Sequence, residues 1–254
     1  MTAEEARSSL RAFVKRVVAR VVPPSLVERP SPVTARHQEK SLIFSADDEP
    51  GRPSRELIDR ALEFVTAARD IDLGAVTRRI PNGIAYTEVW PGEHYKLLAG
   101  IVKVLQPRLV IEVGTATGLS ALSLTQELHR GGRVVTFDLV PWREYPGHVL
   151  AESDFADGRL EQRLEDLSDP TQFSKSRDLV ERAELIFVDA AKDGAQEQRF
   201  LDHFETCRFA KPPLIVFDDI RLWNMLRIWR LVKRPKLDLT SFGHWSGTGI
   251  VLWV

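Results

Sequence analysis

The stretch "VIEVGTATGLSALSL", residues 110–124, decides how this chain folds. It begins with a short, mostly apolar run of strand length, which ends at Val113 and passes into a turn that contains Gly114 and Gly118. From Leu119 onward the apolar residues suit a helix. A strand, a glycine-containing turn and a helix in this order favour close approach of the backbone to a ligand. The turn lacks the third glycine of the dinucleotide fingerprint G-x-G-x-x-G, so it does not identify its ligand alone.

Similar short runs follow this stretch toward the C-terminus. The strands that we expect span residues 109–113, 133–137, 160–164, 185–188, 213–217, 237–242 and 249–254. Short apolar strands separated by helical segments predict a parallel sheet with helices on both faces. The last two strands are joined by the short loop 243–248, so we expect them to pair antiparallel at one edge. The predicted fold class is α/β, a doubly wound, Rossmann-like sheet of seven strands with an antiparallel last strand.

The residues before the sheet predict a helical N-terminal arm and connector over residues 1–85, ahead of a main domain over 86–254. Thr2 and Glu5 form a capping box, and apolar residues then recur at helical spacing among Arg and Lys. We favour an arm that packs on this chain or on the partner of a homodimer; a membrane-surface helix and a frayed tail are the alternatives. Prolines within residues 23–53 predict an irregular connector. Ser54 should cap the next helix, and another should span about 93–105.

Composition narrows the class of protein. The chain has 254 residues, a 43% hydrophobic content and a formal net charge of −1, so no overall field draws it to nucleic acid, and we expect no such partner. Cys207 is the only cysteine, which excludes an internal disulfide and a cysteine-based zinc cluster. We see no signal peptide and no apolar run of membrane-spanning length, and therefore expect a cytoplasmic protein.

Acidic residues follow several of the predicted strands. Asp138 ends the second strand, at about the distance where a carboxylate that binds ribose hydroxyls is expected. Asp189 follows the fourth strand, and Asp218 and Asp219 follow the fifth. Three carboxylates at adjacent strand ends repel one another unless a cation joins them, and oxygen ligands favour Mg²⁺, Mn²⁺ or Ca²⁺. The alternative is that these acids are solvated or cap helices.

The opening stretch resembles the first motif of class I S-adenosylmethionine-dependent methyltransferases, and the resemblance extends over roughly residues 90–254. It implies that Asp138 holds the ribose of S-adenosylmethionine and that Asp166 lies near the adenine. The residues that it places around the donor's methionine side and methyl group are Glu112, Gly114, Thr115, Gly118, Ser120 and Asp189.

Two further motifs resemble the cation-dependent O-methyltransferases of the catechol and caffeoyl-CoA type. These are the D-x-x-K pattern from Asp189 to Lys192 and the acidic pair Asp218 and Asp219. The resemblance implies a divalent cation on the three aspartates and Lys192 as the base that deprotonates a hydroxyl. Asp219 replaces the more common asparagine, and an acidic pair also resembles metal-dependent sugar methyltransferases of antibiotic pathways. The expected acceptor is therefore a small molecule that is catechol-like, a sugar or another natural product.

Several alternatives stay open at this point. Lys192 could be an ordinary exposed lysine, and its role as a base requires that its pKa fall from about 10.4. The enzyme could work without a metal, or the chain could be a non-catalytic scaffold that binds S-adenosylmethionine. Trp223 and the pair His244 and Trp245 could form an acceptor wall or simply pack against the sheet. The other histidines, His94 among them, receive no chemical role.

Overall fold

The computed structural model describes residues 51–81, 87, 93–222 and 224–254. The predicted arm, most of the connector and Trp223 lie outside the described residues. The described strands are β1 (Leu109–Val113), β2 (Arg133–Asp138), β3 (Leu160–Leu164), β4 (Leu185–Val188), β5 (Leu214–Asp218), β6 (Lys236–Asp238) and β7 (Thr248–Leu252). The described α-helices are α4 (Arg55–Arg69), α5 (Gly74–Thr77), α6 (His94–Leu105), α7 (Leu119–Gln126), α8 (Pro170–Val180), α9 (Gln196–Glu205) and α10 (Met225–Leu231). Two 3₁₀ helices, η4 (Trp142–Glu144) and η5 (Glu152–Phe155), lie between β2 and β3.

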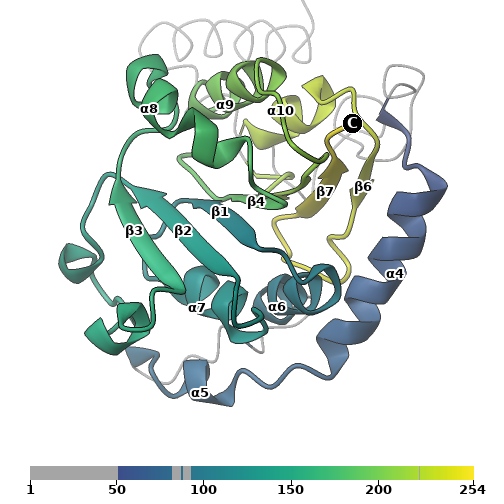
Figure 1. Ribbon diagram of the computed structural model, residues 1–254. Coiled ribbons are helices and arrows are strands. Elements are labelled where there is room, and N and C mark those ends of the chain that lie inside the picture. The colour runs from purple at the N-terminus through teal and green to yellow at the C-terminus, as the bar shows by residue number, and fades with distance from the viewer. Residues whose placement is uncertain (1–50, 82–86, 88–92, 223) are drawn as a thin grey trace, which may run out of the picture.

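The seven strands form one sheet in the order β3-β2-β1-β4-β5-β7-β6, which confirms the predicted doubly wound fold (Figure 1). The strands β1 to β5 pair parallel, and the order reverses direction between β1 and β4. The expected antiparallel pairing of the last two strands is also confirmed. However, β7 lies inside the sheet, between β5 and the edge strand β6, and is antiparallel to both neighbours.

The last strands are shorter than the sequence suggested. The apolar pattern predicts strand structure up to residue 242, but β6 ends at Asp238. The carboxylate of Asp238 accepts hydrogen bonds from the backbone N–H and the hydroxyl of Thr240, which turns the chain away from the sheet. The loop between β6 and β7 is therefore longer than expected, and it reaches back toward the end of β5.

Helices cover both faces of the sheet, and each face has its own hydrophobic core (Figure 1). Along β1, Val110 packs with α4, α6 and α7, whereas Ile111 packs on the other side with α8, α9 and α10. All five residues of β1 are buried, as expected for a central parallel strand. The position of this strand brings the glycine-containing turn to the middle of the sheet edge.

Helices α4 and α5 pack into the same core as the sheet. Ser54 caps α4 as predicted, because its hydroxyl accepts a hydrogen bond from the N–H of Leu57. Gly100 on α6 lets α4 approach closely, since a Cβ there would lie 2.9 Å from the backbone oxygen of Phe64. The domain boundary between residues 85 and 86 stays a prediction.

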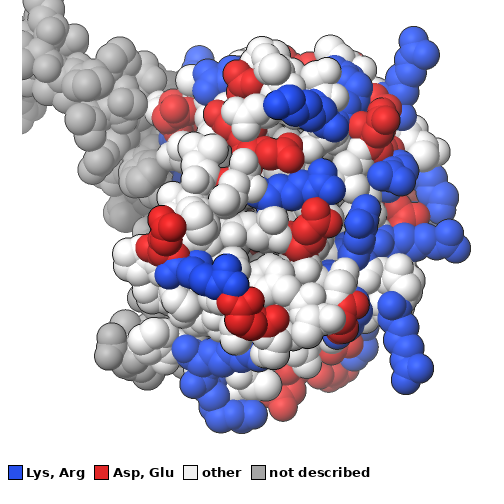
Figure 2. Space-filling model, turned by 60° about the vertical axis from the view of Figure 1, so that its left-hand side comes forward, with Lys and Arg blue, Asp and Glu red and all other residues white. Residues whose placement is uncertain are grey.

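The surface carries both signs of charge. Figure 2 shows basic and acidic side chains interspersed over one face of the described molecule, in keeping with the near-zero net charge. Among the helices in the described part of the chain, none combines the length and apolar character needed to cross a bilayer.

Candidate active site

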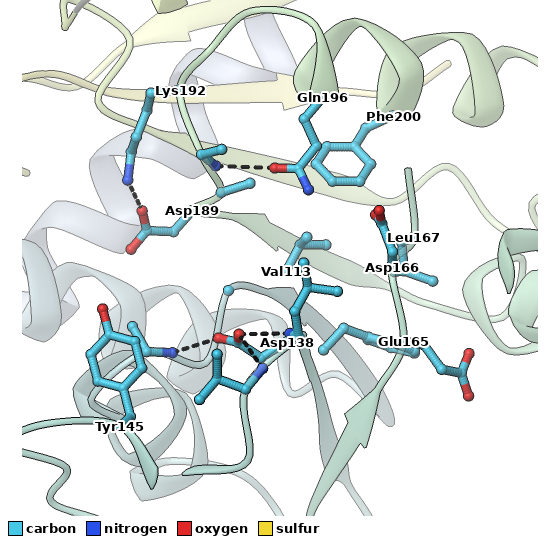
Figure 3. A pocket seen from close by; sticks show the side chains of 17 residues that line it. Val113, Asp138, Tyr145, Glu165, Asp166, Leu167, Asp189, Lys192, Gln196 and Phe200 are labelled. Carbon is cyan, nitrogen blue, oxygen red and sulfur yellow. Dashed lines mark hydrogen bonds and ion pairs between the residues drawn. The ribbon is translucent and has the colours of Figure 1, made fainter. Parts of the chain in front are cut away.

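A cavity of about 430 Å³ lies beyond the carboxyl ends of β1, β2, β3 and β4 (Figure 3). This is the point where the strand order reverses, at which open α/β sheets bind their ligands, and the volume suits a small molecule. Figure 3 shows Asp189 and Lys192 pointing toward one another, with Asp138 and Asp166 further along the same cavity. We call it the switch-point cavity.

The glycine-containing turn forms part of its wall. Gly114 has a φ of +102°, and a Cβ there would lie only 1.9 Å from the backbone oxygen of Asp189. Gly118 also has a positive φ, and a Cβ there would overlap the side chain of Leu150. Both glycines are needed for conformation and for space. The turn after β1 and the turn after β4 are therefore in direct backbone contact.

Some residues that the resemblance assigns to the donor line the cavity and others lie behind its wall. Gly114, Asp138, Asp166 and Asp189 are lining residues. The carboxylate of Asp138 accepts hydrogen bonds from the N–H groups of Ala116, Leu139 and Val140, which hold it at the end of β2. The residues that do not belong to the lining are Glu112, Thr115, Gly118 and Ser120.

Glu112 is fully buried behind this wall. Both of its carboxylate oxygens lack a hydrogen-bond partner among the described residues. Burial raises its pKa to about 8, and the nearby hydroxyls of Ser120 and Thr136 offset only part of that rise. A buried carboxyl group without a partner beside a cavity is a suitable contact for a cationic group of a ligand.

The structure brings the four predicted residues after β4 and β5 together. We call Asp189, Lys192, Asp218 and Asp219 the acidic cluster. The ammonium group of Lys192 donates to Oδ1 of Asp189 and lies 3.0 Å from Oδ2 of Asp219. Lys192 is thus not an ordinary exposed lysine: its side chain is 15% exposed.

A buried carboxylate fixes the backbone of this lysine. Glu197 on α9 is fully buried and accepts hydrogen bonds from the N–H of Lys192, at 2.7 Å, and of Gly194, at 2.9 Å. Lys192 has a φ of +58°, a conformation that non-glycine residues adopt at a cost. Glu197 therefore holds the loop after β4 in a shape that directs Lys192 toward the acids.

The electrostatics of the cluster follow from burial and from mutual charge. Burial, followed by the charges of Asp189 and Asp219, raises the pKa of Asp218 well above its usual range. Burial alone would lower the pKa of Lys192, but the charges of Asp189 and Asp219 outweigh it and raise that pKa. In this arrangement Lys192 is a charged partner of the acids. As the sequence already indicated, Lys192 requires a lowered pKa to act as a base. In this arrangement its pKa is raised instead.

Two histidines adjoin the cluster, of which the sequence offered His244 only as part of an acceptor wall and gave His94 no role. Nδ1 of His244 lies 3.5 Å from Oδ1 of Asp219, which also accepts a hydrogen bond from the hydroxyl of Ser246. His94, at the start of α6, is buried with Nδ1 at 3.3 Å from Oγ1 of Thr248. Burial and, after it, the nearby His244 lower the pKa of His94 to about 3, so its ring is neutral at neutral pH.

No local motif marks these histidines. They come from segments that are 150 residues apart, and β7 brings them together because Thr248 lies opposite Asp218 in the sheet register. The rings of His94 and His244 lie 5.5 Å apart between centroids. From the sequence, these histidines could have been placed beside Asp218 and Asp219 only if β7 had been known to lie next to β5.

Comparison with known proteins agrees with this geometry. Residues 111–220 match a family model described as a methyltransferase domain. The matched segment runs from β1 through the end of β5, so it includes the glycine-containing turn and most of the residues that line the switch-point cavity.

Solved structures with a similar fold are also known. The chain is similar to a candidate caffeoyl-CoA O-methyltransferase from Staphylococcus aureus, with a TM-score of 0.51 and 14% identity over 78% of this chain and 100% of that one. It also resembles TomG from Streptomyces achromogenes, an O-methyltransferase involved in tomaymycin synthesis and solved with SAM, at a TM-score of 0.48 and 18% identity over 77% and 90% of the two chains. At 14% identity, the likeness to the Staphylococcus aureus structure concerns the fold alone.

Proposed function

We propose that this protein transfers a methyl group from S-adenosylmethionine to a hydroxyl group of a small molecule, with a divalent cation at the acidic cluster. The observation that carries the proposal is the position of Asp189. It lines the switch-point cavity and also belongs to the acidic cluster, so a donor in the cavity would meet an acceptor held by the acids. Catalysis of methyl transfer rests largely on such positioning.

The residues around the cavity suit the donor. Asp138 and Asp166 offer carboxylate oxygens for ribose and adenine at one part of the cavity. Glu112 offers a buried carboxyl group without a hydrogen-bond partner, which suits the donor's amino group. The donor, when bound, supplies a methyl group on a positively charged sulfur. Gly114 lets the turn after β1 lie against the backbone of Asp189, which fixes the wall that the donor would contact.

The cluster also suits a cation. Oδ1 of Asp218 is buried and has no hydrogen-bond partner among the described residues, which is unfavourable unless a cation is bound. Asp218 and Asp219 would hold the ion, and the sequence predicts Asp189 as a third ligand. A bound ion would orient the acceptor and lower the pKa of its hydroxyl group. Lys192 is the proposed base once the ion is bound, because the positive charge of the ion would offset the acids that raise its pKa in the ion-free arrangement.

A second candidate is methyl transfer without a metal. It is favoured by the position of Lys192, which contacts both Asp189 and Asp219 and already balances part of their charge. In that case Asp189 and Lys192 would bind the acceptor hydroxyl directly.

The acceptor belongs, in our proposal, among catechol-like and other aromatic natural products. Trp245, which contacts the ring of His244, is 53% exposed, and Phe242 in the same loop between β6 and β7 is 49% exposed, so this loop offers apolar area. A sugar acceptor would use the same acids but would have less use for these rings. The homodimer contact, the membrane alternative for the arm and the cytoplasmic location stay predictions from the sequence.

The test is a methyl-transfer assay that detects S-adenosylhomocysteine, run on catechols, caffeoyl esters and sugar diols, with and without EDTA. We expect turnover on an aromatic diol, its loss with EDTA and its return with Mn²⁺ or Mg²⁺. Asp189→Asn should abolish turnover, whereas the control Asp178→Asn, at an exposed position of α8, should not. Full activity after chelation would favour the metal-free candidate, and donor binding without turnover on any acceptor would favour a non-catalytic scaffold.

A further inference from the structure

We infer that the divalent cation of this protein is held by Asp218, Asp219 and His244, so that an imidazole takes the place predicted for Asp189. This ligand set rests on the proposed function for the role of the ion in the reaction. It can be tested by ion binding alone, without the donor or the acceptor.

The geometry of the three side chains already approaches that of a metal site. Each residue offers one ligand atom, and the three atoms all lie within 4.8 Å of one another. Around an ion with bonds of about 2.1 Å, ligand atoms are roughly 3 to 4 Å apart. The 3.5 Å between Nδ1 of His244 and Oδ1 of Asp219 falls in that range. Small side-chain rotations would therefore complete the set.

An independent observation points to a cation at this place. Asp218 is only 6% exposed, and its Oδ1 has no hydrogen-bond partner among the described residues. The nearest ring nitrogen, Nδ1 of His94, is 3.8 Å away, which is too far for a hydrogen bond. A buried carboxylate oxygen without a partner is costly, and a bound ion would remove that cost.

Asp219 separates the proposed ion from Lys192. Its Oδ2 faces the ammonium group of Lys192, whereas its Oδ1 faces Ser246 and His244. An ion on the Oδ1 side can bind without displacing Lys192. Asp189 is already bonded to Lys192 and does not belong to the group of three ligand atoms. The structure thus assigns Asp189 to the lysine and His244 to the ion.

The loop that carries His244 is held in place by neighbouring hydroxyl groups. Oγ1 of Thr248 accepts a hydrogen bond of 2.9 Å from the backbone N–H of His244 and lies 3.3 Å from His94. The hydroxyl of Ser246 contacts Nδ1 of His244 and Oδ1 of Asp219, so it occupies the place between these two atoms that an ion would take. The contact of Thr248 with the backbone of His244 is an outer contact of the kind that orients metal-binding side chains.

The ligand set has a consequence for the choice of ion. Two carboxylates with one imidazole suit Mn²⁺, Fe²⁺, Co²⁺ or Zn²⁺, whereas Mg²⁺ and Ca²⁺ favour oxygen ligands alone. We therefore expect Mn²⁺ to bind more tightly than Mg²⁺. A site made of three aspartates would show a smaller preference.

The test titrates Mn²⁺ and Mg²⁺ into the full chain, stripped of metal with a chelator, by calorimetry and by the electron paramagnetic resonance of free Mn²⁺. We expect one Mn²⁺ site, a tenfold or larger loss of affinity in His244→Ala and Asp218→Asn, and a change of less than about twofold in Asp189→Asn. His129→Ala is the matched histidine control, and circular dichroism checks folding. Spin-echo modulation from a directly bound nitrogen should appear with the native protein and vanish in His244→Ala.

The outcomes separate the two proposals. If Asp189→Asn weakens Mn²⁺ binding as much as Asp218→Asn while His244→Ala and its nitrogen signal are without effect, the three-aspartate site replaces the inferred one. No binding of either ion at millimolar concentration would also overturn the inference. Binding as inferred, but without methyl transfer to any acceptor, would leave the ion site standing and refute the proposed reaction.

Discussion

The side chains of Lys192 and Asp219 meet at 3.0 Å, and both residues have a backbone φ of +58°. Neither is a glycine, so each conformation costs of order 1 kcal/mol or more. Each is held by neighbours: Glu197 binds the N–H of Lys192, and Ser246 binds the carboxylate of Asp219. Backbone strain on both partners of one ion pair is typical of a functional site.

Removing the charge of Lys192 should abolish most of the proposed activity. Lys192→Met keeps the length of the side chain but removes the proton acceptor and leaves Asp189 without its partner. We expect kcat to fall by about 10²-fold or more, the usual contribution of a general base. Steady-state kinetics on the best acceptor measures this, with Lys175→Met on the exposed side of α8 as the control. An unchanged kcat would exclude Lys192 as the base.

Glu197 should act on the reaction through Lys192. Glu197→Ala leaves the buried N–H of Gly194 and the partly buried N–H of Lys192 without an acceptor, so the free energy of unfolding should fall by about 1–3 kcal/mol. Glu197→Gln keeps an acceptor oxygen and should recover part of both stability and kcat. Urea unfolding and kinetics measure the two effects, and Asp202→Ala, also on α9, is the control. If Glu197→Ala and Glu197→Gln both had the kcat of the control, the loop after β4 would not need the carboxylate of Glu197 for the reaction.

Gly114→Ala should disrupt the turn after β1, because its Cβ would meet the backbone oxygen of Asp189 at 1.9 Å. Backbone atoms cannot rotate away, so we expect loss of S-adenosylmethionine binding in calorimetry and a lower unfolding temperature. Gly158→Ala is the matched control, since Gly158 also has a positive φ but no atom within 4 Å of the added Cβ. That variant should lose only about 1 kcal/mol. If both variants lost the same stability, the positive φ of Gly114, and not its contact with Asp189, would explain why a glycine is needed there.

Glu112 should make the ligand-free protein less stable as the pH rises. Its folded-state pKa of about 8 exceeds the ordinary value of 4.5, so the folded state binds more protons than the unfolded state between these values. The free energy of unfolding should therefore fall across this window, by up to about 1.4 kcal/mol per pH unit. Urea unfolding from pH 5 to pH 8 measures the slope. Glu112→Gln should have a shallower slope, and an identical one would contradict the assignment.

The sheet was predictable because its apolar runs end sharply at charged residues. The runs before Asp138, Asp189 and Asp218 became β2, β4 and β5 with bounds within one residue of those expected. Their acids meet because parallel strands share an edge. The predicted end of β6 was wrong. The side chain of Asp238 ends this strand by accepting a hydrogen bond from the N–H of Thr240, and the spacing of apolar residues cannot predict such a contact.

The histidines beside the acidic cluster were not predictable in the same way. The sequence showed that β6 and β7 pair with each other, but it did not show which of them would join β5. Had β6 taken that place, another segment would have faced Asp218. His94 adds a second difficulty, because it begins a helix in the chain before the sheet and carries no motif around it.

The inserted position of β7 makes the end of the chain essential to the candidate site. Strands β1 to β5 follow one another in the chain before β6, whereas β6 touches the sheet only through β7, which comes after it in the sequence. The segment that carries His244 lies between these two strands. A chain cut before β7 would therefore keep Asp218 and Asp219 but lose the strand that holds β6 and the His244 loop beside them.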